Sequence, residues 1–238
     1  MYVRIYNLVI RIVNFRGDFM KKLVIDLGHG GNDPGAIGQG GTHEADIVLD
    51  IGKEIEILLK GYKVDYKFTR LTNKSVSLLE RCRIANGFNA DYFVSIHINS
   101  ASDKSVRGVE VFKYSNSNGK INKFCDDVCG DISKQLSIRN RGPKIGNQLY
   151  VVKNTKMPAA LIEVDFISNT DCERDLNDLN NIKKLSKIIF DRLIDMVGLE
   201  TKDDRLYRVC IGAYRDKNNA VKQLEIAKNK GFKDSYII

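Results

Sequence analysis

Four side chains of the 238-residue chain are suited to binding a metal ion and activating water. His29 and His97 each lie near the end of an apolar stretch, and Glu44 follows His29 by fifteen residues. Two imidazoles and one carboxylate are a typical catalytic zinc set, with a fourth position left for water. Glu163 could serve as the general base toward that water as it attacks a carbonyl. The pattern therefore favours a zinc-dependent hydrolase.

Each of these residues also has a purely structural interpretation. A single strand histidine is more often structural than a ligand, and Glu163 could be a buried carboxylate paired with a base. His43 adjoins Glu44 and could be the ligand instead. If a helix begins at Thr42, the two side chains point about 100° apart, so only one can face the site. The apolar stripe of that helix favours Glu44.

Apolar periodicity and turn residues divide the chain into alternating strands and helices. Strands are predicted over residues 22–27, 63–69, 91–99, 108–114, 148–152 and 159–166. Helices are predicted between 42 and 61, from 77 onward, over 116–136 and over 180–197, and a basic loop over 140–146. This alternation predicts an α/β fold, with a mostly parallel sheet covered by helices on both faces.

The candidate site residues fall where such a fold binds its ligands. His29, His97 and Glu163 lie near the carboxyl ends of three different predicted strands, and Glu44 lies in the first turn of a helix. Ligands of open α/β sheets bind beyond the carboxyl ends of the strands. We therefore expect folding to bring the four side chains together.

Composition narrows the choice of partners. The formal net charge of +8 suggests an anionic partner: nucleic acid, a membrane surface or a cell-wall polymer. The basic residues are spread along the chain, without zinc-finger spacing or an RNA-binding signature, so nucleic acid is not expected. The five cysteines are an odd number and do not indicate a disulfide framework, which favours folding in a reducing compartment.

The chain is expected to have a main domain over residues 20–197 and three smaller segments. Residues 1–19 are apolar but interrupted by arginines, too short to span a membrane and unlike a signal peptide. We interpret them as an N-terminal extension, with an edge strand or a membrane-surface arm as the alternative. Residues 198–205 form a polar linker, and residues 206–238 indicate a small strand–helix–strand segment.

Four segments carry a family resemblance: LVIDLGHGGNDPGA from Leu23, THE from Thr42, VSIHINS from Val94 and MPAALIEVDFISN from Met157. In this order and spacing they resemble the zinc-dependent N-acetylmuramoyl-L-alanine amidases of the amidase-3 type, which include bacterial autolysins and phage endolysins. The resemblance covers about residues 21–197.

The resemblance implies a six-stranded mixed sheet with helices on both faces. It also implies one Zn²⁺ per chain, bound by His29, Glu44 and His97, with Glu163 as the catalytic carboxylate. The implied substrate is peptidoglycan. The bond cut is the amide between the lactyl group of N-acetylmuramic acid and the L-alanine that begins the stem peptide.

Two positions depart from the family pattern. Leu27 stands where the family often has proline, which affects only the approach to the glycine loop. Asp165 stands where the family often has glycine. It either tunes the pKa of Glu163 or points to the opposite face of the sheet.

Asn99 and Arg141 are the candidate substrate-binding residues. Arg141 also fits an alternative, a zinc carboxypeptidase, in which a cation holds the terminal carboxylate of the substrate. Arg139 and Lys144 are similarly placed, and all three equally suit an anionic glycan. A second alternative, a degenerate amidase that only binds peptidoglycan, is disfavoured because all three ligands and the catalytic carboxylate are present.

Residues 206–238 are similar to the first strand–helix–strand unit of a SPOR-type peptidoglycan-binding domain, which is about twice as long. The alternative is an appendage packed on the catalytic domain. We expect no stable membrane insertion, and a monomer although the sequence leaves the oligomeric state open. Because no signal peptide is visible, we expect the protein to remain cytoplasmic until a phage pore or cell lysis releases it to the cell wall.

Overall fold

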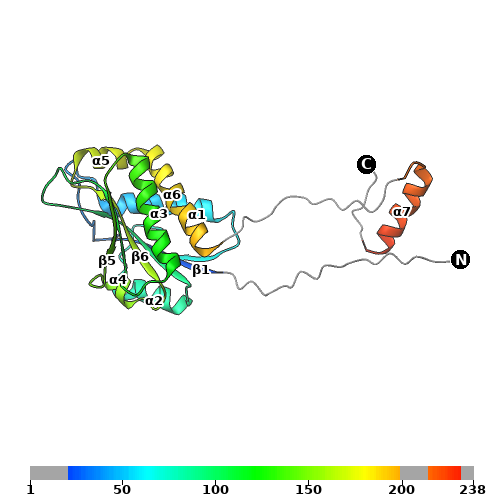
Figure 1. The fold of residues 1–238 in the computed structure, drawn as a ribbon, viewed down its shortest axis with the longest axis horizontal. Helices are drawn as coiled ribbons and strands as arrows, with labels where there is room; N and C mark the ends of the chain where they lie inside the picture. Colours follow the sequence, from blue (N-terminus) through cyan, green and yellow to red (C-terminus); the bar gives the residue numbers. More distant parts are fainter. Residues whose placement is uncertain (1–20, 199–213, 232–238) are drawn as a thin grey trace. The chain divides into compact units, whose positions relative to one another are not determined.

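The computed structural model describes residues 21–198 and 214–231 (Figure 1). The chain divides into two compact units, Met1–Lys202 and Asp203–Ile238, and each is described by itself. The predicted extension over 1–19, nearly all of the linker and the two strands predicted in the tail lie outside the described residues.

The first unit contains a single six-stranded sheet. Its strands are β1 (Lys22–Leu27), β2 (Asp65–Phe68), β3 (Tyr92–Asn99), β4 (Val109–Lys113), β5 (Asn140–Ile145) and β6 (Ala159–Phe166). Their order is β2-β1-β3-β6-β4-β5. Only the β4–β6 pair is antiparallel. The predicted mixed, mostly parallel sheet is therefore confirmed.

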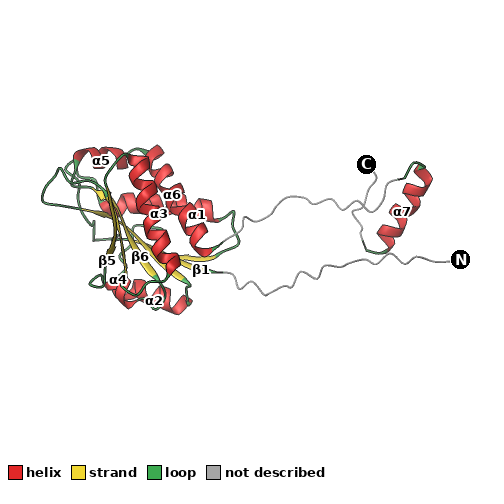
Figure 2. Cartoon of the chain, viewed as in Figure 1, coloured by secondary structure: helices red, strands yellow, loops and turns green. Residues whose placement is uncertain are grey.

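Helices cover both faces of this sheet, as predicted (Figure 2). The helices are α1 (Glu44–Leu59), α2 (Leu78–Phe88), α3 (Gly119–Leu136), α4 (Tyr150–Asn154), α5 (Thr170–Leu176) and α6 (Leu179–Val197). Helices α1, α3 and α6 share the larger core, and α2 and α4 pack over the other face. Side chains alternate between the faces along each strand.

This alternation decides where the candidate site residues point. On β3 and β6, Phe93 and Leu161 belong to the smaller core beneath α2 and α4. His97 lies four residues after Phe93, and Glu163 two residues after Leu161, so both side chains face the same side. The candidate site therefore lies on the α2–α4 face, at the carboxyl ends of the central strands.

Two predictions from the sequence are wrong for the segment that forms the edge strand β5 and the residues that follow it. The segment predicted as a loop, 140–146, forms β5, which pairs in parallel with β4 at the edge of the sheet. An edge strand accommodates glycine, proline and charged residues because only one side is hydrogen-bonded to a neighbour. The segment predicted as a strand, 148–152, instead enters α4, where Val151 and Val152 are both buried. A short apolar run does not distinguish strand from helix.

The start of α1 also differs from prediction, and one helix was not predicted from the sequence. The residue that precedes α1 is His43 rather than Thr42, and its side chain makes no capping hydrogen bond. Thr42 instead donates its backbone N–H to Glu173 at 3.0 Å. That glutamate belongs to α5, a helix that was not expected from the sequence. Only seven residues long, α5 carries too little apolar periodicity, and its start is fixed by the side chain of Asn169.

The second unit contributes one described helix, α7 (Lys217–Asn229), within the segment predicted to contain one. The side chain of Asp216 caps it by accepting hydrogen bonds from the backbone of Asn218 and Asn219. Within the described ranges, no helix combines the length and apolar character needed to cross a membrane.

Candidate metal centre and active site

The fold brings His29, Glu44 and His97 into one cluster. One ligand atom from each lies within 4.8 Å of the other two. Nε2 of His29 is 3.2 Å from Oε2 of Glu44, and Nδ1 of His97 is 3.0 Å from Oε1. The imidazoles meet edge to face, with ring centroids 4.9 Å apart. Across residues 21–198 and 214–231, this is the one group of three or more such side chains with metal-binding geometry.

The approach of the two histidines depends on glycines. A Cβ at Gly28 would lie 2.4 Å from Cε1 of His97, so a side chain at position 28 would displace that ring. A Cβ at Gly35 would lie 2.6 Å from Oε2 of Glu44, and its φ of +69° also favours glycine. The glycines of the loop therefore leave room for the ligand side chains.

His29 itself has a φ of 58°, in the left-handed region that non-glycine residues rarely adopt. The buried guanidinium of Arg81 holds this backbone by donating to the carbonyl of His29 at 2.7 Å and to Asp26 at 2.6 Å. Asp26 is fully buried and also accepts hydrogen bonds from Thr69 and Ser95. The end of β1 is thus fixed to α2, β3 and the segment after β2.

A second buried arginine fixes the same turn to α1. Arg70 donates to the carbonyl of Gly28 at 2.6 Å and to that of Ala45 at 2.8 Å. Because Ala45 follows Glu44, this arginine connects the backbones that carry two of the three candidate ligands.

Asp33 orients the imidazole of His29. Its Oδ2 accepts a hydrogen bond of 2.8 Å from Nδ1, which directs Nε2 toward Glu44. Carboxylates commonly hold metal-binding histidines in this way. Burial lowers the pKa of His29, but hydrogen bonds and charge from Glu44 and Asp33 outweigh it and raise the pKa to about 9. Asp33 was not among the site residues predicted from the sequence, although an aspartate four residues after a candidate ligand in a glycine loop was an available signal.

Glu44 is held as an ionised carboxylate. It is 3% exposed and accepts backbone hydrogen bonds of 2.9 Å from Ala36 and from Ile98. Burial raises the pKa of Glu44, but the hydrogen bonds from the two imidazoles lower it well below its usual range. His43, the alternative ligand, is about half exposed and lies 3.6 Å from Asp46. Of the two neighbours, the fold places Glu44 in the cluster.

Glu163 lies beside the cluster and lacks a partner for one oxygen. It is the register partner of His97, on the adjacent strand. Its Oε2 is buried without a hydrogen bond from any described residue. Burial raises its pKa to about 7, with His97 opposing this shift and Glu44 and Glu110 adding to it. A carboxylate with such a pKa is suited to general acid–base catalysis near neutral pH.

The cluster opens into a cavity of about 290 Å³ between α2 and α4. His29, His97 and Glu163 line it together with Asp26, Asp33, Arg81, Leu78, Leu149, Tyr150, Val151 and Leu161. A His–Glu–His donor set matches the ligands of a catalytic zinc ion, and Glu163 lines the same cavity. The residues present therefore fit Zn²⁺ with a buried carboxylate beside it.

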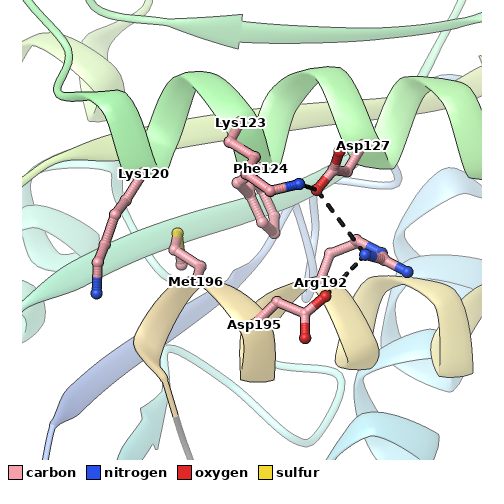
Figure 3. Close-up of a pocket in the computed structure, with 7 residues that line it drawn as sticks. All are labelled: Lys120, Lys123, Phe124, Asp127, Arg192, Asp195 and Met196. Carbon is pink, nitrogen blue, oxygen red and sulfur yellow. Dashed lines mark hydrogen bonds and ion pairs between the residues drawn. The ribbon is translucent and has the colours of Figure 1, made fainter.

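A second hollow, of about 60 Å³, lies between α3 and α6 on the other face of the sheet (Figure 3). Four of its five charged side chains pair with one another: Lys123 with Asp127 at 2.6 Å, and Arg192 with Asp195 at 2.7 Å. It contains none of the predicted site residues.

Two of the remaining candidates contact Glu110, which lies on β4, on the other side of β6 from the strand of His97. Asn99 and Arg141 both bind Glu110, at 2.9 and 2.8 Å. Asp165 makes its hydrogen bonds away from Glu163: it accepts from Arg107 at 2.7 Å and from the backbone of Gly108 at 2.7 Å. The charge added at position 165 is therefore balanced by an arginine.

Comparison with known proteins assigns the family. Residues 23–195 match the family model of N-acetylmuramoyl-L-alanine amidases. The chain belongs to this family. The predicted family, enzyme class and fold of the amidase are therefore confirmed.

Individual relatives agree with this assignment. The amidase is 33% identical over 221 residues to the N-acetylmuramoyl-L-alanine amidase CwlM of Bacillus licheniformis, an alignment that spans 92% of this chain and 85% of that one. It is 42% identical over 159 residues to the endolysin of Bacillus phage SPP1, spanning 64% and 57%. The catalytic domain of the amidase CwlV from Bacillus (Paenibacillus) polymyxa superimposes with a TM-score of 0.70 and 29% identity, covering 76% of this chain and all of that domain.

Proposed function

We propose that this amidase uses one Zn²⁺, held by His29, Glu44 and His97, to cut the amide bond between N-acetylmuramic acid and L-alanine in peptidoglycan. One observation carries the proposal: three ligand atoms lie within 4.8 Å of one another, beside a buried carboxylate oxygen that has no partner among the described residues. A buried unpaired carboxylate costs free energy, which is explained if the group acts on substrate.

Glu163 has the central chemical role in the proposed reaction. When bound, zinc supplies Lewis acidity toward water and toward the amide carbonyl. Glu163 accepts a proton from the attacking water as the water oxygen forms a bond to the lactyl carbonyl carbon. Glu163 then donates that proton to the alanine nitrogen as the carbon–nitrogen bond breaks, so the products are a free lactyl carboxylate and a free peptide amine.

The other residues of the site prepare this step. Asp33 keeps the proton of His29 on Nδ1, so that Nε2 is free to bind the metal. The apolar wall formed by Leu78, Leu149 and Val151 lowers the local dielectric and strengthens interactions with the developing charge.

Beyond the active site, we propose that the protein acts at the cell wall as an endolysin or autolysin and contacts peptidoglycan over more than its cleft. The net charge of +8 suits an anionic wall polymer. We further propose that the segment 206–238 takes part in wall binding, and the similarity to CwlM spans more of the chain than the family match over 23–195. We propose that the enzyme acts as a monomer.

The metal assignment is tested by measuring bound zinc in purified protein. The wild type should hold one equivalent, and His97→Ala should lose most of it. His43→Ala, which removes the exposed neighbour of Glu44, is the matched control and should keep the full equivalent. Equal zinc in all three proteins would contradict the assignment of His97, and a loss in His43→Ala alone would assign the site to His43.

A further inference from the structure

A second buried carboxylate lies next to the proposed catalytic one. Glu110 on β4 is 3% exposed and is the register partner of Glu163 on β6. Two cations share its Oε2: Nε of Arg141 at 2.8 Å, and Nζ of Lys144. Asn99 donates to Oε1 at 2.9 Å. Glu110 and these three side chains therefore form a cluster with a net positive charge beside the proposed catalytic groups.

Arg141 is fixed in place but has unused donors. Its Cζ lies 5.0 Å from the ring centroid of Phe166, and a Cβ at Gly108 would lie 2.8 Å from its Cδ. Among the described residues, only its Nε has a hydrogen-bond partner, so neither terminal nitrogen bonds a protein acceptor. The side chain is 27% exposed. A rigidly held guanidinium with two free nitrogens is well suited to binding a carboxylate in a bidentate manner.

The negative charge of Glu110 is balanced without Arg141. Lys144 supplies one positive charge for the single negative charge, and Asn99 satisfies the other oxygen. Arg141 is therefore the surplus cation of the cluster. It bonds to the register partner of Glu163, and its side chain is 27% exposed, so a bound molecule has access to it.

The position of the cluster matches the length of a peptide. Neighbouring strands are about 4.8 Å apart, so Glu110 is one strand spacing from Glu163. One residue of extended chain spans about 3.5 Å. A group on the residue that follows L-alanine can therefore reach Arg141 while the amide before L-alanine lies at Glu163.

We propose that Arg141, held by Glu110 and Phe166 and accompanied by Lys144, forms a subsite for a carboxylate on the residue that follows L-alanine in the stem peptide. This inference rests on the proposed function, because it assumes that the scissile amide lies at Glu163. It makes Arg141 a specificity-determining residue that reads the charge of the stem peptide.

The test compares two soluble substrates with the zinc-loaded enzyme. One is N-acetylmuramoyl-L-alanyl-D-glutamate, and the other is the same compound with both carboxyl groups of the glutamate converted to amides. For the wild type, kcat/KM should be about tenfold higher for the acid, as expected for one charge-assisted hydrogen-bonded pair. Arg141→Gln should lower kcat/KM for the acid by about the same factor and change that for the amide by less than about threefold.

Arg83→Gln is the matched control. Arg83 is exposed on α2, so its substitution removes the same charge outside the cleft and should preserve the wild-type preference for the acid. Arg141→Lys should give an intermediate preference, because it keeps the charge and loses the planar fork.

Two results would overturn the inference and leave the proposed function intact. The first is an equal kcat/KM of the wild type for both substrates. The second is that Arg141→Gln lowers kcat/KM by the same factor for both substrates. If the wild type cuts neither compound but cuts intact peptidoglycan at a bond other than the amide before L-alanine, the proposed function and this inference both fail.

Discussion

His97 on β3 and Glu163 on β6 are register partners across two neighbouring parallel strands. One is a proposed metal ligand and the other is the proposed base. Their separation is therefore set by backbone hydrogen bonds in the middle of the sheet and does not depend on a loop. Catalytic groups held on rigid elements are positioned more precisely than groups held on loops.

Substitution of the base should separate metal binding from turnover. Glu163→Gln keeps the size of the side chain but cannot accept a proton, so kcat should fall by a factor of about 10² to 10⁴. Bound zinc should stay at one equivalent, since Glu163 is not a proposed ligand. The measurement is turnover and zinc content on the same preparation of Glu163→Gln. A kcat equal to that of the wild type would show that Glu163 is not the general base.

Zinc affinity should depend on pH through His29. Its pKa is raised to about 9 in the metal-free site, so at neutral pH this imidazole carries a proton that zinc must displace. Below pH 9 the apparent association constant should therefore fall as pH falls, by about tenfold per unit for each displaced proton. Competition with a chelator of known affinity between pH 6 and 8 measures this slope. An affinity that is constant over this range would show that His29 does not bind the metal.

Arg81 should affect the metal site without touching the metal. Arg81→Lys keeps a positive charge near Asp26 but loses the donor to the carbonyl of His29, so the left-handed backbone of His29 loses support. We expect weaker zinc binding, by about tenfold, as for other groups that orient metal ligands.

The absorption spectrum of the cobalt-substituted protein should also change in Arg81→Lys, because the spectrum reports the ligand geometry directly. Arg83→Lys, on the exposed side of the same helix, is the control and should match the wild type. An unchanged affinity and spectrum in Arg81→Lys would limit Arg81 to a general role in stability.

The sequence predicted the central strands well. Ile162 ends the apolar run that begins at Ala159, and Val94 and Ile96 lie in the mostly apolar segment 92–98. Such apolar segments are typical of parallel strands that are buried on both faces. Once these strands were placed, the positions of His97 and Glu163 near their carboxyl ends followed from the residue numbering.

The edge of the sheet could not be predicted in the same way. Arg141 and Lys144 lie in a strand that has almost no apolar periodicity and is stabilised by pairing with β4 and by ion pairs to Glu110. These are tertiary contacts between residues more than thirty positions apart in the chain, and no local pattern reports them.

The residues that support the ligands were missed for the same reason. Arg81 has the sequence context of an ordinary helix residue, yet it is buried and binds Asp26, 55 positions earlier in the chain. Its role became visible only when the fold placed α2 against the end of β1.

The central claim is tested most directly by mass spectrometry of the products released from purified peptidoglycan, with and without a chelator. The account predicts free stem peptides with an L-alanine amino terminus, formed by the zinc-loaded enzyme and abolished by the chelator. Stem peptides that remain joined to N-acetylmuramic acid but lack their terminal residues would contradict it and would indicate a carboxypeptidase instead.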